Sequence, residues 1–286
     1  MEAPVSSEES RFSPVAAELA SSRIDTSVAH PARRYNYWLG GKDNFQADRE
    51  SGDAIAAAFP AVRIAALENR YFLRRAVSFL AEEAGIRQFL DIGTGIPTAN
   101  NTHEVAQSIA PHSRIVYVDN DPIVLSHARA LLTSSPEGAT AYIDADLREP
   151  EKILNHPDLL RTLDLSQPVA LMLIAITHFM VDSEDPYGIV SRLLDALPSG
   201  SYLAVSNVTT DLMPPEEKRA ADAAAASGRH GPIRFRSRDE FARFFDGLEL
   251  APPGIGPVAE WRAENEPQPR PSAAEASVYG GVARKP

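Results

Sequence analysis

A carboxylate and a glycine-rich turn follow one another at residues 89–98. The apolar run Phe89–Ile92 contains Asp91 and ends in Gly93-Thr94-Gly95, shortly before Pro97. Because glycine has no Cβ, this turn can adopt backbone angles that other residues avoid and can let a ligand approach the main chain. Pro97 suits a first helical turn, so we expect a helix to begin there with free N–H groups facing a cleft. The pattern predicts strand, ligand-binding turn and helix, the alternative being a glycine turn without a ligand.

A second apolar run, Arg114–Asp119, also ends in a carboxylate. In a βαβ unit this places Asp119 at the tip of the strand beside the glycine turn, where an acidic side chain accepts hydrogen bonds from both ribose hydroxyls. The alternative is that Asp119 only caps the following helix, a position that Asp121 suits better. The two segments together predict a ligand that contains a nucleoside.

The chemistry of the turn favours one kind of nucleoside cofactor. The dinucleotide fingerprint has a third glycine beside the pyrophosphate, and here that place holds Thr98. The Asp91 carboxylate would repel a pyrophosphate but attract an ammonium group. A cofactor with an amino-acid tail is therefore favoured over NAD or FAD.

The chain resembles class I S-adenosylmethionine-dependent methyltransferases at Asp91–Gly95 and Val118-Asp119. More narrowly, it is similar to one bacterial family of these enzymes, long catalogued as a domain of unknown function. The segments that carry this similarity are Ala32–Phe45 (Ala-Arg-Arg-Tyr-Asn-Tyr-Trp-Leu-Gly-Gly-Lys-Asp-Asn-Phe), Gln88–Thr98, Val116–Pro122, Asp146–Pro150 and Gly281–Pro286. The resemblance implies an α/β fold with a doubly wound, mostly parallel seven-stranded sheet, an antiparallel final strand, and S-adenosyl-L-methionine as cofactor.

The resemblance also implies a set of cofactor-binding residues. An acidic residue at the end of the third strand would accept from the adenine amino group; Asp146 is preferred because it begins the family-like Asp-Leu-Arg, with Asp144 as the alternative, and either can be a plain turn residue. The predicted cofactor-binding residues are Tyr37, Asp91, Gly93, Thr94, Gly95, Asp119, Asn120, Asp146, Leu147 and Ala175.

His178 and Asp43 are the candidate catalytic residues. The apolar run 168–176 delivers His178 to the carboxyl edge of the sheet, where it could act as a general base or orient a substrate, unless it is a structural histidine. Methyltransferases of exocyclic base amines have an Asp/Asn-Pro-Pro-aromatic turn after this strand. Here residues 175–179 read Ala-Ile-Thr-His-Phe, which disfavours nucleic-acid amine methylation.

Composition narrows the function classes further. The net charge of −11 disfavours a general nucleic-acid or anionic-membrane binder. The absence of cysteine excludes disulfides, thiolate zinc sites, cysteine nucleophiles and radical chemistry on a cysteine-held cluster, and we predict no metal site. With no long apolar run and no leader, we expect a cytoplasmic protein.

The chain divides into three predicted parts. Residues 1–30 are expected to form a flexible arm, residues 31–85 an N-terminal helical lid, and residues 86–286 the methyltransferase domain. Two helices are expected to meet at Phe59-Pro60, and the aromatic residues of 31–45 either cover a ligand or dock the arm. Asn69-Arg70 could reach the cleft, although a solvated or salt-bridged role is favoured. The basic run 229–236 either holds an anionic substrate or is solvated, and Ser237 to Glu240 predict a capping box.

The leading hypothesis is a methyltransferase that acts on a small-molecule acceptor. The sequence leaves two alternatives: a regulatory protein that binds S-adenosylmethionine without turnover, and an NAD-dependent reductase. The reductase lacks both the third glycine and an evident Tyr-x-x-x-Lys pair. The sequence leaves the oligomeric state open.

Overall fold

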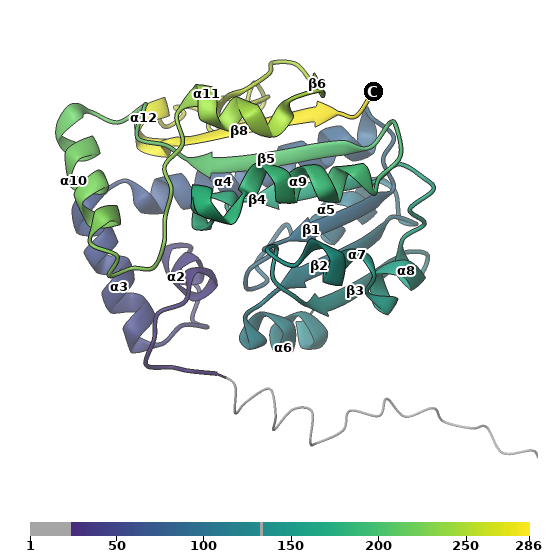
Figure 1. Cartoon of the computed structure of the whole chain (residues 1–286), viewed down its shortest axis with the longest axis horizontal. Coiled ribbons are helices and arrows are strands. Elements are labelled where there is room, and N and C mark those ends of the chain that lie inside the picture. Colours follow the sequence, from purple (N-terminus) through teal and green to yellow (C-terminus); the bar gives the residue numbers. More distant parts are fainter. Residues whose placement is uncertain (1–23, 132–133) are drawn as a thin grey trace, which may run out of the picture.

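The computed structural model describes residues 24–131 and 134–286 and contains one large mixed sheet (Figure 1). The predicted flexible arm lies mostly outside the described residues, but Ile24 packs against the core cluster around Ile96 and Val124. The strands are β1 (Gln88–Ile92), β2 (Arg114–Asp119), β3 (Ala139–Asp144), β4 (Ala170–Ile174), β5 (Tyr202–Val208), β6 (Glu249–Leu250), β7 (Gly256–Pro257) and β8 (Val278–Arg284).

The strand order is β3-β2-β1-β4-β5-β8-β6, and β7 also pairs with β8. The short strands β6 and β7 both lie along β8, so they share the seventh position of the sheet. Strands β1 to β5 pair in parallel, whereas β8 is antiparallel to β5. This confirms the predicted doubly wound, mostly parallel seven-stranded sheet with an antiparallel final strand. The order reverses between β1 and β4, where open α/β sheets have their ligand crevice.

Side chains alternate between the two faces of the sheet, and helices cover both. In β1, Phe89 belongs to the apolar cluster beneath α4 (Val62–Glu82), while Leu90 and Ile92 belong to the cluster on the other face. Because a strand presents successive residues to opposite faces, strands covered on both sides must be apolar throughout.

The helices are α2 (Pro31–Trp38), α3 (Gln46–Ala58), α4 (Val62–Glu82), α5 (Thr102–Ile109), α6 (Pro122–Leu131), α7 (Pro150–Leu154), α8 (Pro157–Thr162), η1 (Thr177–Phe179), η2 (Asp182–Glu184), α9 (Pro186–Asp195), α10 (Pro215–Ala226), α11 (Arg238–Ala242), η3 (Arg243–Phe245) and α12 (Ala273–Ala276).

Helices α2, α3 and α10 stand at the end of the sheet toward which the parallel strands point (Figure 1). We call these three helices the cap. Helix α10 packs against α3, although the two are far apart in the sequence. Helix α4 has a different position, because Phe72, Ala76 and Leu80 are fully buried in the core against the sheet. The predicted lid of residues 31–85 therefore includes one helix that is part of the core.

The helix after the glycine turn begins at Thr102, so the prediction that it begins at Pro97 is wrong. The side chain of Asn101 accepts from the N–H of Thr98 at 3.2 Å, and Glu104 accepts from the N–H of Asn101 at 2.8 Å. These bonds hold residues 97–101 as a loop and give the helix a later start. The strand predicted over 168–176 is also shorter, because Ala175 has a φ of 56° and leaves the extended conformation.

The split at Phe59-Pro60 is confirmed, since α3 ends at Ala58 and α4 begins at Val62. The capping box at Ser237 to Glu240 is confirmed as well, with the N–H of Glu240 donating to Ser237.

Candidate functional site

A cavity of about 440 Å³ lies where the strand order reverses, between the carboxyl ends of the strands and the cap. Residues of the glycine turn and of the ends of β2 and β3 line one part, which we call the cofactor half. Apolar side chains from the cap, α4, the ends of β4 and β5 with the loops after them, and the start of β8 line the other part, which we call the acceptor chamber. Its main apolar residues are Trp38, Ile55, Phe59, Val62, Leu73, Ile174, Ile176, Phe179, Val208, Met213, Ala221, Ala224, Ala225, Ile233, Phe235 and Val278.

The glycine turn presents bare main chain to the cofactor half. Gly93 and Gly95 have φ angles of 75° and 68°, which favour glycine at both positions. The N–H of Gly93 donates to the carbonyl of Val118 at 2.8 Å, so the turn is tied to β2. A Cβ on Gly93 would lie 2.6 Å from the side chain of Ile176, whereas a Cβ on Gly95 would have no atom within 4 Å. Gly95 therefore faces open space.

Asp119 lies beside this turn, as the spacing of the motifs predicts. Its carboxylate accepts from the N–H groups of Gly95 and Asp121, both at 2.9 Å, and burial raises its pKa. A carboxylate has about four lone-pair sites, so two bonds leave acceptor capacity for a ligand. Asp119 lines the cavity, and its two hydrogen bonds hold the carboxylate in place, so that the directions of its free lone pairs are fixed.

Asp91 lies deeper, at the end of β1, and also lines the cavity. It accepts a 2.6 Å hydrogen bond from the hydroxyl of Thr102, and burial raises its pKa to about 6. Arg70 also lines the cavity and donates to the carbonyls of Ala99 and Asn100 at 3.0 and 3.2 Å. The sequence favoured a solvated or salt-bridged role for Arg70, and the structure places it at the site instead.

The remaining predicted cofactor residues form the rim of the same half. Asn120 donates to Asp146 at 2.8 Å, and Asp146 also pairs with Arg148 at 3.1 Å. Thr94, Leu147 and Ala175 line the cavity as well, with Leu147 buried. Of the two acids considered for this position, Asp146 lines the cavity and Asp144 does not.

Tyr37 and Asp43 are the two predicted site residues that do not line the cavity. The hydroxyl of Tyr37 donates to Asp53 at 2.9 Å, and its ring lies under Arg63. Asp43 is partly exposed and lies 3.5 Å from His127. The aromatic residues that reach the cavity from this segment are Tyr35 and Trp38, which are one helical turn apart and share a face of α2 that Tyr37 does not.

His178 reaches the acceptor chamber from η1, just beyond β4. It is 6% exposed, and its Nδ1 has no hydrogen-bond partner in the described structure. Burial, together with the charges of Arg236 and Arg34, lowers its pKa to about 3, so the ring is neutral at physiological pH. Because His178 lines the cavity and this nitrogen has no protein partner, a ligand bound there is the partner it lacks.

Two arginines of the basic run 229–236 hold the turn that carries His178. The N–H of Arg234 donates to the carbonyl of His178 at 2.7 Å. Arg236 is fully buried and donates to the carbonyls of Thr177 and Met180 at 2.8 and 2.9 Å. These two residues are therefore structural, whereas His230 of the same run lines the cavity.

A chain of polar side chains joins the cap to the sheet. The N–H of Ala175 donates to Ser206, whose hydroxyl donates to Asn69 at 2.6 Å. Asn69 in turn donates to the hydroxyl of Tyr35 at 3.0 Å, and Tyr35 donates to the carbonyl of Ala66. This network orients α2 on α4, and no local sequence pattern indicates it because its members come from four separate segments.

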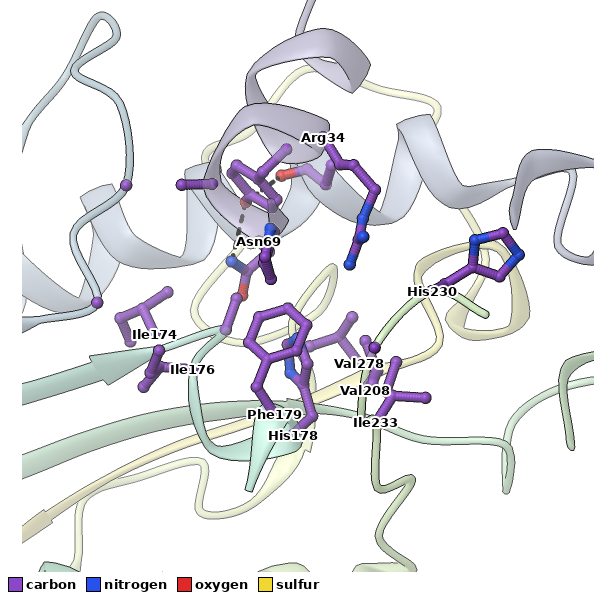
Figure 2. A pocket seen from close by; sticks show the side chains of 18 of the residues that line it. Arg34, Asn69, Ile174, Ile176, His178, Phe179, Val208, His230, Ile233 and Val278 are labelled. Carbon is purple, nitrogen blue, oxygen red and sulfur yellow. Dashed lines mark hydrogen bonds between the residues drawn. The ribbon is translucent and has the colours of Figure 1, made fainter. Parts of the chain in front are cut away.

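Arg34 is the polar residue of the chamber whose role the sequence did not indicate. Figure 2 shows its guanidinium extending from α2 into the space above His178 and Phe179, with His230 to the right of it. Within the quoted N-terminal motif it is one of two adjacent arginines, and only the fold shows which of them faces the cavity. The neighbouring Arg33 points away and pairs with Asp121 at 3.3 Å.

Two negative observations concern the described residues. No helix between residues 24–131 or 134–286 is long and apolar enough to cross a membrane. Within the same ranges, no three histidine, aspartate or glutamate side chains gather as a metal site would require.

Comparison with known proteins gives a consistent result. The family described as S-adenosyl methyltransferase matches residues 17–286. A DUF574 family protein from Streptomyces avermitilis shares 52% identity, with a TM-score of 0.86 over 92% of this chain and 100% of that one. A protein from Thermobifida fusca, provisionally assigned as a methyltransferase, shares 43% identity, with a TM-score of 0.81 over 91% of this chain and 96% of its own. No match was found among the curated proteins.

Proposed function

This chain belongs to the S-adenosyl methyltransferase family, and from that membership we propose that it methylates a small-molecule acceptor bound in the acceptor chamber. S-adenosylmethionine is the family's cofactor. The observation that carries the proposal is the position of the chamber. It adjoins the cofactor half and is lined by apolar side chains from the cap, α4 and the ends of β4 and β5.

The residues of the cofactor half fit S-adenosylmethionine. We propose that Asp119 accepts from the ribose hydroxyls and that Asp146, with Asn120 beside it, accepts from the adenine amino group. Open space at Gly95 lets a ligand lie directly on the main chain, because no side chain fills it. The fit of the cofactor half to S-adenosylmethionine therefore rests on these three polar side chains and on the open space at Gly95.

The methionine tail of the cofactor carries both an ammonium and a carboxylate, so its site needs both signs of charge. Asp91 and Arg70 both line the cavity near the glycine turn, and the charge of Arg70 acts on Asp91. We propose that Asp91 holds the ammonium and Arg70 the carboxylate. The buried position of Asp91 makes this interaction stronger than it would be in water.

When bound, S-adenosylmethionine supplies a methyl group already activated by the sulfonium. The chain therefore needs chiefly to hold an acceptor in line and to exclude water. The apolar walls of the chamber serve the second purpose. His178, whose low pKa makes it a poor base, offers Nδ1 as a hydrogen-bonding group that orients the acceptor.

The test has two parts that separate an enzyme from a protein that only binds the cofactor. Calorimetry with S-adenosylhomocysteine should show a single site per chain. Transfer of isotope from methyl-labelled S-adenosylmethionine should then be screened over small-molecule acceptors. Cofactor binding with no transfer to any acceptor, small or macromolecular, would support the regulatory alternative, and transfer only to nucleic acid or protein would refute the small-molecule assignment.

A further inference from the structure

Arg34 is a buried cation without a counter-ion. Its side chain lines the acceptor chamber, and the residue is only 4% exposed. In the described part of the chain, no carboxylate lies within ion-pair distance of it, its Nε has no hydrogen-bond partner, and its one side-chain bond is a 3.4 Å contact from Nη1 to Ser51. An unpaired buried charge is costly, so a fold that keeps one there indicates a partner that enters from outside.

Asp48, the acid whose charge acts on Arg34, is already engaged by other groups. Asp48 is fully buried and accepts from the N–H groups of His30 and Phe45, each at 2.8 Å. Arg33 lies 3.6 Å from the same carboxylate and 3.3 Å from Asp121. The charge of Asp48 does favour protonated Arg34, but burial outweighs it and lowers the pKa of Arg34 to about 10. Arg34 is therefore still protonated at neutral pH.

Two histidines that line the chamber lie around Arg34, with His178 below its guanidinium and His230 to one side in the view of Figure 2. His178 has an unpaired Nδ1, and the charge of Arg34 is one cause of its low pKa. His230 has its Nδ1 2.9 Å from the hydroxyl of Ser51, which is also the contact of Arg34. A neutral imidazole can donate one N–H, so a guanidinium and an imidazole donor are available to the same ligand.

The charged groups of the cavity are divided between its two halves. The carboxylates Asp91, Asp119 and Asp146 line the cofactor half, where Arg70 and Arg148 accompany them. The acceptor chamber has Arg34 and no carboxylate among its described lining residues. One unpaired positive charge in apolar surroundings matches one negative charge on the ligand.

We propose that the acceptor is a carboxylic acid with an apolar body, whose carboxylate is bound by Arg34 and receives a hydrogen bond from His178. This inference rests on the proposed function, because it names the substrate class of the same chamber. The planar fork of arginine matches a carboxylate in a bidentate geometry. The apolar body would lie against Phe179, Val208 and Val278.

Binding, rather than turnover, gives the direct test. The protein is first saturated with S-adenosylhomocysteine, and the affinities of hexanoate, 3-phenylpropionate and indole-3-acetate are compared with those of their neutral amides. We expect at least one acid to bind at least 10-fold more tightly than its amide. Equal affinities within every pair, or no binding of any probe, would overturn the proposal. Tighter binding of phenyl phosphate than of all three acids would overturn the assignment to a monoanion.

A variant series assigns the effect to Arg34. Arg34→Gln should reduce the affinity for the bound acid about 10- to 100-fold and leave that for the amide unchanged. Arg34→Lys should retain part of the preference, because it keeps the charge without the fork. The matched control is Arg63→Gln, which removes an exposed arginine of α4 that does not line the cavity. Undiminished acid binding in Arg34→Gln would refute the assignment.

The same experiment separates this proposal from the proposed function. S-adenosylhomocysteine should bind wild type, Arg34→Gln and Arg63→Gln alike, which also shows that the variants are folded. If S-adenosylhomocysteine fails to bind the wild-type protein, the proposed function is in error. If it binds and the acids show no preference, only the assignment of the acceptor class fails.

Discussion

The main-chain N–H of Gly95 donates a 2.9 Å hydrogen bond to Oδ2 of Asp119. This bond joins the turn after β1 to the last residue of β2, which is the neighbouring parallel strand. It fixes the carboxylate at the edge of the bare main chain, so the two features that define the cofactor half are positioned by each other.

Asp119→Asn should weaken the binding of S-adenosylmethionine by about 1–3 kcal/mol, the scale of a hydrogen bond to a charged group. The shape of the side chain and one acceptor oxygen are retained, so we expect thermal unfolding to stay cooperative. Calorimetry on the variant measures the loss. Asp195→Asn, which changes an exposed residue on α9, is the control and should have no effect. Unchanged affinity in Asp119→Asn would remove this residue from the cofactor site.

Gly95→Ala should reduce cofactor affinity by more than it reduces stability. The added Cβ enters the open space of the cofactor half, and the positive φ adds backbone strain of about 1 kcal/mol. Gly247→Ala is a matched control, because Gly247 also has a positive φ and no atom within 4 Å, and it does not line the cavity. The two variants should lose similar stability in thermal melts. Equal cofactor affinity in both would show that Gly95 does not contact the ligand.

The free energy of unfolding should depend on the ionisation of Asp91. Its pKa in the folded state, about 6, lies above the unfolded value of 3.8, so the native state binds the proton more tightly. The stability from this group is complete below pH 4 and is lost as the pH rises through 6, by about 3 kcal/mol. Asp91→Asn should lack this loss, which denaturant unfolding at pH 4 and pH 7 would measure.

Saturating S-adenosylhomocysteine should reduce the pH-dependent loss in the wild-type protein, because its ammonium group would favour the ionised Asp91. If the ligand stabilises wild type and Asp91→Asn equally at both pH values, the ammonium does not lie at Asp91.

His178 should remain neutral from pH 5 to pH 8 in the ligand-free protein. Its pKa of about 3 lies below the usual 6.5, so the unfolded chain binds a proton that the native chain does not. Stability is therefore lost as the pH falls below 6.5, by about 2 kcal/mol at pH 5. NMR titration of the ring Hε1 should show no shift over this range, and His178→Gln should lose less stability in acid. A ring that titrates near 6.5 would contradict the burial of this group.

Ala224→Phe should block methyl transfer while leaving cofactor binding intact. Ala224 lies on α10 and lines the acceptor chamber, so a large side chain there occupies the space of the acceptor. Ala223→Phe is the matched control, because the adjacent residue is exposed and does not line the cavity. S-adenosylhomocysteine affinity and methyl transfer should be measured on both. Loss of cofactor binding in Ala224→Phe would show that the two halves are not independent.

The sequence alone determined the sheet and the cofactor. Apolar runs without a polar face, each ending in a carboxylate or a glycine turn, predict parallel strands covered on both sides, and their spacing places Gly95 beside Asp119. The antiparallel final strand and S-adenosylmethionine itself were expected because these motifs resemble those of class I methyltransferases.

The tertiary structure decided which residues of the helical segments reach the site. Within α2, the sequence favoured Tyr37, but the docking of that helix turns Tyr35, Arg34 and Trp38 toward the cavity and Tyr37 toward Asp53. A local pattern does not contain this information, because the rotation of a helix is set by side chains from distant segments, here Asn69 of α4. Arg34 is left unpaired for the same reason, because the fold commits the carboxylate of Asp48 to the N–H groups of His30 and Phe45.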